Sequence, residues 1–333
     1  MSSIVILGAG AWGTALALCL ARAKHQVTLC ARRAEHAAAM RSAHENAAYL
    51  PGVALPESIQ ITDRWNDAAR AAEVVVMAVP SRFARTAMTP VGAALTAQTT
   101  LVSVTKGIEE HSLKAMSAML GEVAPELRNL AVLSGPSFAP EVARGKPAAI
   151  VAAANDEAVA REVQTLFASR ALRVYRTTDV IGVELAGAAK NVIAIAAGMC
   201  DGLALGASAR AALITRGLAE LARLGRASGA LAETMYGLAG LGDLVLTCTG
   251  DLSRNRTLGL MIGRGESATD LTSPATGAPV AEGLSNVRSI RALAERKGVE
   301  MPIVAAVCRV LYEGAAADAM VDELLSRELK REF

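Results

Sequence analysis

The sequence predicts an α/β domain built on a mostly parallel sheet, followed by an all-α domain. Its 333 residues exceed the size of one ordinary hydrophobic core, so two domains are expected. The first half alternates short β-rich runs with helical patterns, as βαβ crossovers do. After about residue 178 the strand signals fade, and helical stretches rich in Ala, Leu and Gly continue to the end. We therefore expect one domain over residues 1–180 and a second over residues 181–333, joined through the helix that contains Lys190.

The first half contains a series of hydrophobic runs of strand length. They cover residues 3–7, 26–30, 58–62, 73–79, 100–104, 130–133 and 148–152. The run EVVVMAV at 73–79 lacks polar alternation, which is typical of a strand covered on both faces. Helices are expected after the first two strands, at residues 14–23 and 33–41. In the second half the expected helices cover residues 180–199, 208–226, 230–237, 255–263, 281–297, 303–313 and 318–329.

Composition excludes several classes of protein. With 34 basic and 32 acidic residues, the net charge of +2 does not support a nucleic-acid-binding surface. The five cysteines are odd in number and widely spaced, and the four histidines do not cluster with them. We therefore expect neither a disulfide framework nor a metal site, and a reducing cytoplasm fits this pattern.

The uncharged stretch at residues 1–21 resembles a membrane span in a hydropathy window. Three glycines interrupt it, and it lacks the basic start of a signal peptide. A strand, a glycine turn and a buried helix explain it better, so we expect no membrane span.

The glycine turn is the strongest local motif. Gly8, Gly10 and Gly13 form a G-x-G-x-x-G pattern, with Ala11 and Trp12 inside it, directly after a strand and before an Ala-rich helix. In the Rossmann fold these glycines make the tight turn, admit the pyrophosphate and let helix and strand pack closely. The helix N-terminus offers free N–H groups to phosphate. The sequence therefore predicts a dinucleotide-binding Rossmann domain rather than a glycine turn without a ligand.

The second strand bears on which dinucleotide is bound. An NAD site usually has Asp or Glu at its end, but here the strand runs into Arg32 and Arg33. Two guanidinium groups at this point suit a 2′-phosphate, which favours NADP, alone or beside NAD. The alternative is a solvated start to the next helix.

Polar groups also follow two later strands. Lys106 comes directly after residues 100–104 and before a glycine, and ligands of open α/β sheets bind beyond the carboxyl ends of strands. The loop SGPSFA, residues 134–139, follows the next strand and is rich in backbone N–H groups. Both segments are candidates for contact with substrate or nicotinamide. The alternative for Lys106 is an ordinary surface lysine.

Lys190 lies in an otherwise uncharged helical segment, LAGAAKNVIAIAAG. On a helix Ala186, Ala194 and Ala197 share its face, which we expect to leave room for cofactor or substrate. Apolar surroundings destabilise an ammonium group, so the pKa of Lys190 is expected to fall toward neutrality. That would suit proton donation to a carbonyl oxygen. The alternative is a lysine that reaches solvent at a domain edge.

Two further clusters lie in the second half. Asp243 follows the flexible GLAGLG segment, where it would orient a lysine or bind substrate hydroxyls, or else cap a helix. Ser253, Arg254 and Asn255 then stand at an expected helix start, where hydroxyl, guanidinium, amide and helix N-terminus make a phosphate site. The alternative for that run is a solvated loop.

The order of these motifs resembles the bacterial NAD(P)-dependent glycerol-3-phosphate dehydrogenases. GAGAWGTALA, VAVPS, SVTKG, SGPSFA, GVELAGAAKNVIAIAAGMCDGL, TRGLAE, GLAGLGDLVLTCT and SRNR follow one another as in that family, over nearly the whole chain. The resemblance implies a two-domain architecture similar to that of 6-phosphogluconate dehydrogenase. It also implies reversible reduction of dihydroxyacetone phosphate to sn-glycerol 3-phosphate, which feeds phospholipid synthesis, with Lys190 as proton donor and acceptor.

The resemblance further implies roles for individual residues. Residues at the catalytic centre would be Lys190, Lys106 and Asp243. The substrate would be contacted by Lys106, Gly135, Ser137, Lys190, Asp243, Ser253, Arg254 and Asn255. The cofactor would be contacted by Gly8, Gly10, Ala11, Trp12, Gly13, Arg32, Arg33, Tyr49, Lys106, Ala139, Arg254, Val280 and Glu282. Ala11 and Ser137 stand where relatives often have Ser and Thr, which bears on affinity rather than activity.

Two other functions compete with this one. A dehydrogenase of the same architecture could act on another small phosphorylated or acidic substrate, and fold alone does not exclude it. A redox-sensing module would keep the cofactor but is expected to lose Lys190 or Asp243, and both are present. The Gly- and Ala-rich second half also suggests a homodimer.

Overall fold

The computed structural model describes residues 1–272, 282–329, 331 and 332. Its N-terminal part is built on one eight-stranded sheet with the order β3-β2-β1-β4-β5-β6-β7-β8. The strands are β1 (Ser3–Leu7), β2 (Gln26–Cys30), β3 (Ile59–Thr62), β4 (Val74–Met77), β5 (Thr100–Ser103), β6 (Asn129–Ser134), β7 (Ala148–Ala153) and β8 (Leu172–Thr177). Strands β1 to β6 run parallel, β7 is antiparallel to β6, and β8 is parallel to β7. The predicted mostly parallel sheet is thus confirmed.

Strand β8 is absent from the sequence prediction, although its residues alternate. Leu172 and Val174 point into the core, while Arg173 and Tyr175 between them are exposed. The strand lies at the edge of the sheet and carries two arginines, so its hydrophobic signal is weak. The sheet therefore extends almost to the point where the long central helix begins.

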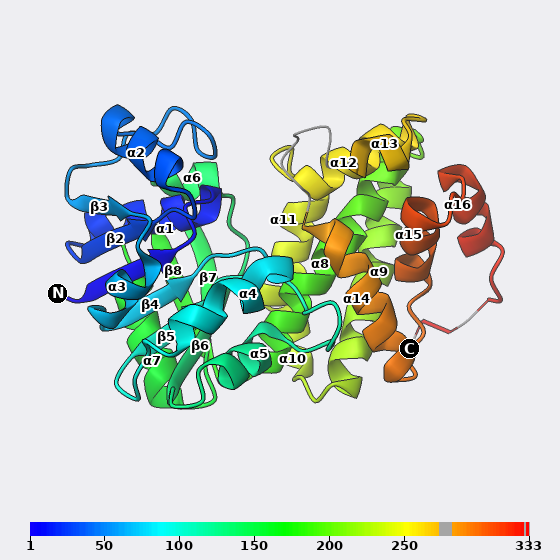
Figure 1. The fold of residues 1–333 in the computed structure, drawn as a ribbon. Helices are drawn as coiled ribbons and strands as arrows, with labels where there is room; N and C mark the ends of the chain where they lie inside the picture. Colours follow the sequence, from blue (N-terminus) through cyan, green and yellow to red (C-terminus); the bar gives the residue numbers. More distant parts are fainter. Residues whose placement is uncertain (273–281, 330, 333) are drawn as a thin grey trace.

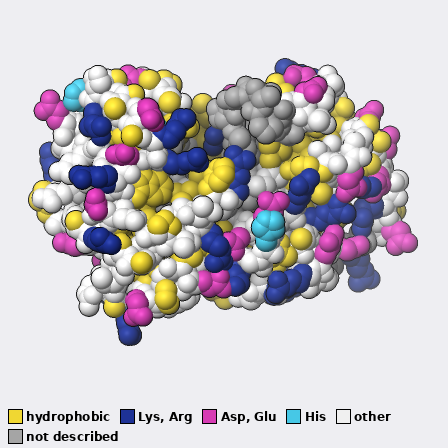
Figure 2. Space-filling model, in the orientation of Figure 1, with side chains coloured by type: hydrophobic (Ala, Val, Ile, Leu, Met, Phe, Trp, Pro, Cys, Tyr) yellow, Lys and Arg dark blue, Asp and Glu magenta, His cyan; other side chains and the backbone are white. Residues whose placement is uncertain are grey.

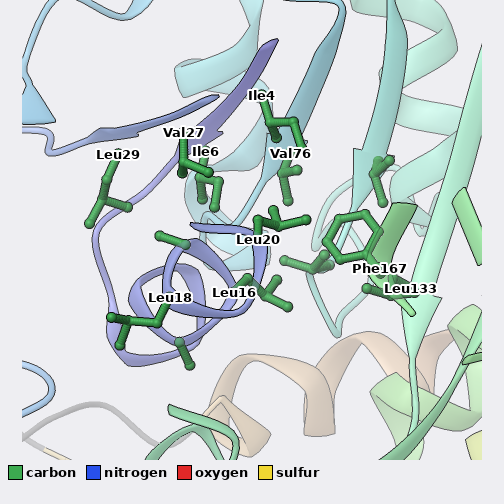
Figure 3. Close-up of a cluster of buried hydrophobic side chains, with 14 of the residues drawn as sticks. Ile4, Ile6, Leu16, Leu18, Leu20, Val27, Leu29, Val76, Leu133 and Phe167 are labelled. Atoms are coloured by element: carbon green, nitrogen blue, oxygen red, sulfur yellow. The ribbon is translucent and has the colours of Figure 1, made fainter. Parts of the chain in front are cut away.

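Both faces of the sheet are buried, which explains the apolar runs. Ile4 and Ile6 of β1 belong to one core cluster, and Val5 and Leu7 belong to another on the opposite face. Figure 3 shows the first cluster, in which Ile4 and Ile6 of β1 lie on the side of the sheet that faces Leu16, Leu18 and Leu20 of helix α1.

Helices cover the two faces of the sheet (Figure 1). One core cluster includes residues of α1 (Ala11–Arg22), α2 (Ala34–Ala43), α6 (Ala139–Ala143) and α7 (Glu157–Phe167). The other includes residues of α3 (Trp65–Arg70), α4 (Ser81–Gly92) and α5 (Met116–Val123).

The second half is helical, as predicted. Its helices are α8 (Val180–Gly202), α9 (Ala207–Ala227), α10 (Ala232–Tyr236), the π-helix η1 (Leu238–Gly242), α11 (Asp243–Thr249), α12 (Arg254–Gly263), α13 (Ala268–Thr272), α14 (Gly283–Arg296), α15 (Pro302–Tyr312) and α16 (Ala317–Leu325). The short elements η1, α11 and α13 were not predicted as helices, because their Gly-rich or short segments give little helical periodicity.

Helix α8 is the centre of this half and packs against α9, α11, α12, α14 and α15. Among the described residues it is the one helix long and apolar enough to cross a membrane, and 94% of that apolar window is buried inside the protein. A helix that is apolar all round and enclosed in this way forms a core.

One expectation for α8 is wrong. Ala186, Ala194 and Ala197 are completely buried by the surrounding protein and leave no open space for a ligand. The small residues of α8 serve close packing instead. A Cβ atom at Gly198 would lie 2.0 Å from the Arg256 carbonyl oxygen on α12.

Candidate active site

The glycine turn has the geometry that a dinucleotide site needs. Gly8 has φ +118°, and a Cβ atom there would lie 2.4 Å from the Ala78 carbonyl oxygen. A Cβ atom at Gly13 would lie 2.1 Å from the Gly8 oxygen, so helix α1 packs closely on the strand. Gly10 borders open space and begins α1 without a side-chain cap, which leaves the helix N-terminus available to an anion.

Residues outside the motif hold this turn in place. Asn46 is fully buried, and its amide nitrogen donates to the Ala9 carbonyl at 2.9 Å and to the Thr14 hydroxyl at 2.8 Å. Its oxygen lies 3.0 Å from the His36 ring, against which Tyr49 is tilted at 5.3 Å between ring centroids. Half-exposed Tyr49 is therefore linked to the glycine turn through two side chains, a connection that the sequence does not reveal.

The two arginines after β2 are exposed. Neither Arg32 nor Arg33 has an ion-pair partner among the described residues. The Arg32 guanidinium lies 5.9 Å from the ring of the exposed Phe83, and Arg82 lies 4.5 Å from the same ring. The guanidinium groups of Arg32 and Arg82 thus lie near one aromatic ring, beyond the ends of β2 and β4.

The structure brings three of the predicted residues together at the junction of the two halves. Lys106 donates to Asp243 Oδ2 at 2.6 Å and to the Gly135 carbonyl at 3.0 Å. Lys190 donates to Asp243 Oδ1 at 2.5 Å and to the Thr247 hydroxyl at 2.8 Å. One carboxylate therefore holds two ammonium groups from elements far apart in the sequence. The suggestion that Asp243 caps a helix is wrong, because Gly242 stands at the N-cap of α11 and Asp243 is the first residue of that helix.

Burial sets the chemistry of this trio. The side chains of Asp243 and Lys190 are 1% and 7% exposed. Burial lowers the pKa of Lys190 to about 8, while the Asp243 carboxylate opposes this and the nearby Lys106 adds to it. The expected fall toward neutrality is thus present. An amine with this pKa can both give and take a proton near neutral pH.

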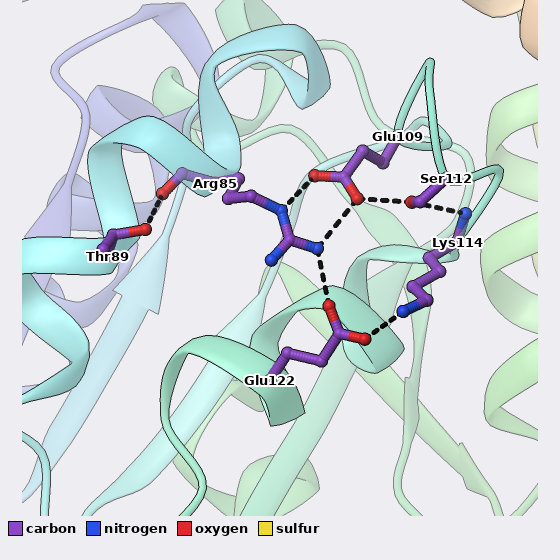
Figure 4. A network of polar contacts seen from close by, with 6 residues as sticks. All are labelled: Arg85, Thr89, Glu109, Ser112, Lys114 and Glu122. Carbon is purple, nitrogen blue, oxygen red and sulfur yellow. Dashed lines mark hydrogen bonds and ion pairs between the residues drawn. The ribbon is translucent and has the colours of Figure 1, made fainter.

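A network of polar contacts holds the segment that follows Lys106 in the chain (Figure 4). Glu109 accepts from Arg85 of α4 at 2.6 Å and also binds Ser112. Arg85 donates to Glu122 of α5 at 2.7 Å, and Lys114 pairs with the same carboxylate. These bonds tie the segment after β5 to two helices, so the Lys106 backbone is anchored on the sheet domain.

The loop after β6 lies beside the lysines. The Gly135 carbonyl accepts from both Lys106 and the Ser137 hydroxyl, the latter at 3.0 Å. Gly135 has φ +139°, and a Cβ atom there would lie 2.8 Å from the Ile150 Cα atom. Ala139 begins helix α6, whose N-terminus faces the end of this loop.

The N-terminus of α12 has the features predicted for a phosphate site. Ser253 caps the helix by accepting from the Arg256 N–H at 3.2 Å. Arg256 is held by two carboxylates, those of Asp201 and Asp251. The exposed Arg254, in contrast, has no ion-pair partner among the described residues. Arg254 is therefore the guanidinium of this run that is free to bind an anion.

Asn255 is buried and bridges helices. Its nitrogen donates to Asn191 Oδ1 at 3.0 Å, and its oxygen accepts from the Gly283 N–H at 2.9 Å. Glu282 stands at the start of α14, next to that N–H. Val280 lies outside the described residues.

Figure 2 shows Lys and Arg side chains along the hollow between the two parts of the molecule, with hydrophobic side chains beside them. Such a hollow at the carboxyl ends of the parallel strands is where open α/β proteins bind ligands.

Several residues of this region were missed by the sequence reasoning. Thr247 stands four residues after Asp243 on the same helix, a spacing that places both on one face. Asn191 follows Lys190, and its buried amide nitrogen has no partner in the described part of the chain. Trp12 was expected at the cofactor, and its buried Nε1 likewise has no partner there. Asn46 and Phe83 carry no motif by which the sequence would single them out.

A Rossmann sheet with an unobstructed glycine turn, joined to a helical domain by a buried lysine–aspartate–lysine arrangement, defines an NAD(P)-linked two-domain dehydrogenase. The N-terminal model of NAD-dependent glycerol-3-phosphate dehydrogenase matches residues 3–160, and the C-terminal model matches residues 179–322. The chain therefore belongs to the NAD-dependent glycerol-3-phosphate dehydrogenase family.

Individual relatives cover the whole chain. Glycerol-3-phosphate dehydrogenase [NAD(P)+] of Geobacter sp. strain M21 is 49% identical over 99% of this chain and 98% of its own length. The protein of the same name from Thiobacillus denitrificans is 47% identical over 99% of both. The crystal structure of glycerol-3-phosphate dehydrogenase from Coxiella burnetii matches with a TM-score of 0.93 and 39% identity, over 98% of this chain and 99% of that one.

Proposed function

We propose that this chain catalyses the reversible, NAD(P)H-dependent reduction of dihydroxyacetone phosphate to sn-glycerol 3-phosphate. The observation that carries the proposal is that Lys106 and Lys190 share the buried Asp243 carboxylate beside the α12 N-terminus, where Arg254 has no ion-pair partner among the described residues. Reduction of this substrate requires a proton donor for the ketone oxygen and a binding site for the phosphate. The names of the relatives support the same substrate.

Each residue of the trio has its own task. Lys190 holds a proton on Nζ and donates it to the C2 oxygen of the ketone during reduction, or accepts it during oxidation. Asp243 orients both ammonium groups, and Lys106 supplies positive charge to the developing alkoxide. When bound, the nicotinamide supplies or accepts the hydride.

Other residues hold the phosphate end of the substrate. Arg254, Ser253 and Asn255 would bind the phosphate at the start of α12. Gly135 and Ser137 would close the pocket from the sheet domain. Enclosure between the two parts of the molecule would exclude water from the reacting carbon.

The glycine turn fits the pyrophosphate of the cofactor, because Gly10 borders open space at an uncapped helix N-terminus. Arg32 and Arg33 would take the 2′-phosphate, so we propose NADP as the preferred cofactor, with NAD as the alternative. The remaining proposed contacts are Gly8, Ala11, Trp12, Gly13, Tyr49, Lys106, Ala139, Arg254, Val280 and Glu282.

The proposal extends to the setting of the reaction. Residues 1–180 would bind the cofactor, and residues 181–333 would bind the substrate. The product would enter phospholipid synthesis in the cytoplasm, where the five free cysteines are stable. We also propose a homodimer, which sedimentation of the purified protein would test.

The decisive assay follows nicotinamide absorbance after addition of dihydroxyacetone phosphate, with NADPH and NADH in parallel. Rapid oxidation of either cofactor is expected, with none when unphosphorylated dihydroxyacetone replaces the phosphate. Binding of a cofactor without oxidation would contradict the proposed substrate.

Lys190→Ala tests the proton donor in the same assay. It should fold and bind cofactor but lose roughly 10²–10⁴-fold in kcat. Lys146→Ala is the control, because Lys146 is 62% exposed and pairs with a surface glutamate. Near-normal turnover by Lys190→Ala would remove the assigned role.

A further inference from the structure

Helix α14 places a buried amide between the two halves of the active site. Asn286 is fully buried. Its nitrogen donates to the Lys106 carbonyl at 3.2 Å and to the Ala188 carbonyl on α8 at 3.3 Å. One side chain thus bonds to the backbone of the segment after β5 and to the helix that carries Lys190.

The surroundings of Asn286 leave little room for movement. A Cβ atom at Gly107 would lie 2.9 Å from Asn286 Oδ1 and 2.3 Å from the Ser81 hydroxyl oxygen. The backbone next to Lys106 therefore fits closely between α4 and α14.

The Oδ1 atom of Asn286 is buried, and none of the described residues donates a hydrogen bond to it. A buried carbonyl oxygen without a partner is unfavourable, and an apolar side chain of similar size would avoid that cost. The two donated bonds are thus the feature that distinguishes asparagine from leucine at this position.

We propose that Asn286 is a positioning residue that holds the Lys106 backbone at a set distance from α8, so that Lys106 and Lys190 share the Asp243 carboxylate. The two lysines come from different halves of the molecule, and no other described side chain bonds to the backbone of both segments. The inference rests on the proposed function, in which Lys190 transfers the proton.

This arrangement has an electrostatic consequence. The groups that face Lys190 are Asp243, Thr247 and Cys248 of α11, Lys106, and Glu282 before α14. Lys106 lowers the pKa of Lys190, whereas Asp243 and Glu282 raise it. If Lys106 withdraws, Asp243 interacts with Lys190 alone, and the pKa of Lys190 rises.

The test replaces Asn286 by leucine, which has a similar volume and no donor. Ser289→Ala is the matched control, because Ser289 is equally buried on α14 and its hydroxyl donates, among the described residues, only to the Ser285 carbonyl of its own helix. Asn286→Leu should lower kcat at least tenfold. The alkaline limb of kcat/KM for reduction should move up by at least half a pH unit. Ser289→Ala should change none of these.

A second variant covers the case in which leucine does not fit. Asn286→Ser is smaller and keeps one donor, so it should show a smaller loss of kcat and a limb that moves in the same direction. A folded Asn286→Leu with the kcat and pH limb of Ser289→Ala would overturn the proposal. If the leucine variant does not fold, the serine variant decides. The positioning role of Asn286 would be overturned if Asn286→Ser left the alkaline limb of kcat/KM for reduction at its original pH.

The failure of this inference is distinguishable from failure of the proposed function. If Lys190→Ala abolishes turnover while Asn286→Leu behaves as the control, only the positioning role is lost. If Lys190→Ala retains turnover, the proton-transfer assignment is lost.

Discussion

At the scale of single residues, two opposing electrostatic effects set the pKa of Lys190. Burial disfavours its ammonium form, and a carboxylate at 2.5 Å favours it. The result is a pKa of about 8, low enough for a lysine to lose its proton near neutral pH.

This pKa predicts opposite pH dependences for the two directions of the reaction. Reduction needs protonated Lys190, so its kcat/KM should fall as the pH rises through about 8. Oxidation needs the neutral amine, so its kcat/KM should rise through the same range. Asp243→Asn removes the carboxylate that raises the pKa of Lys190. The fall of kcat/KM for reduction should therefore occur at lower pH in this variant. Steady-state rates from pH 6 to 10 measure both, and parallel profiles in the two directions would contradict the assignment.

Arg32 and Arg33 make a separate prediction about the cofactor. In the double variant Arg32→Asp, Arg33→Ser, the ratio of kcat/KM for NADPH to that for NADH should fall roughly 10–100-fold. That corresponds to about 1.5–3 kcal/mol for a hydrogen bond to a charged group. Arg161→Ser, which removes an exposed arginine on α7, should leave the ratio unchanged. An unchanged ratio in the double variant would refute the role of the pair.

At the scale of elements, the position of Lys190 depends on how closely α8 and α12 pack. Glycines on each of the two helices lie directly against the backbone of the other helix. A Cβ atom at Gly259 of α12, for example, would lie 1.9 Å from the Ile195 carbonyl oxygen of α8. The same contact places Arg254 at the start of α12 near the catalytic helix, so packing here also sets the distance from the phosphate site to the lysines.

Gly259→Ala should therefore force the two helices apart. We expect a loss of about 1–3 kcal/mol in the free energy of unfolding, together with a raised KM for the substrate. Gly121→Ala is the control, because that helical position on α5 borders open space and should gain about 0.5–1 kcal/mol. Denaturant unfolding compares the two, and equal stability would show that α8 and α12 can separate without cost.

At the scale of the whole molecule, α8 joins the two halves through polar as well as apolar contacts. Glu184 of α8 is buried and accepts from the Ser117 N–H at 2.7 Å and from its hydroxyl at 2.5 Å, at the start of α5. Burial raises the pKa of Glu184 to about 7. A carboxyl group is thus held between the sheet domain and the catalytic helix.

This group should make stability depend on pH. A carboxyl whose pKa is raised on folding contributes stability that is present below about 4.5 and lost as the pH rises through about 7. Glu184→Gln keeps the two contacts with a neutral side chain. The free energy of unfolding of this variant, minus that of the unaltered protein, should therefore increase by roughly 1–3 kcal/mol from pH 5 to pH 8. Glu220 has a similarly raised pKa but is common to both proteins. Chemical denaturation across this range measures the difference, and a constant difference would show that Glu184 stays charged.

Much of the molecule follows from the sequence because the signals are local. The β1 and β2 strands were predicted at the observed residues. The glycine turn was predicted from the spacing of three glycines between a strand and a helix, where each glycine has a steric purpose. The sequence also predicted apolar surroundings for Lys190, because the helical segment around it carries no other charge. These features depend on residues that are neighbours along the chain.

The tertiary structure decided which distant side chains meet. Lys106 and Asp243 lie 137 positions apart in the chain, and Lys106 and Asn286 lie 180 apart, so no periodicity or motif connects them. The structure also showed that the alanines of α8 are enclosed rather than open, because helix packing depends on the partner surface as well as on the helix itself. The sequence by itself determined the Rossmann domain, the helical domain and the family, and the tertiary structure decided that two lysines from opposite halves share one buried carboxylate.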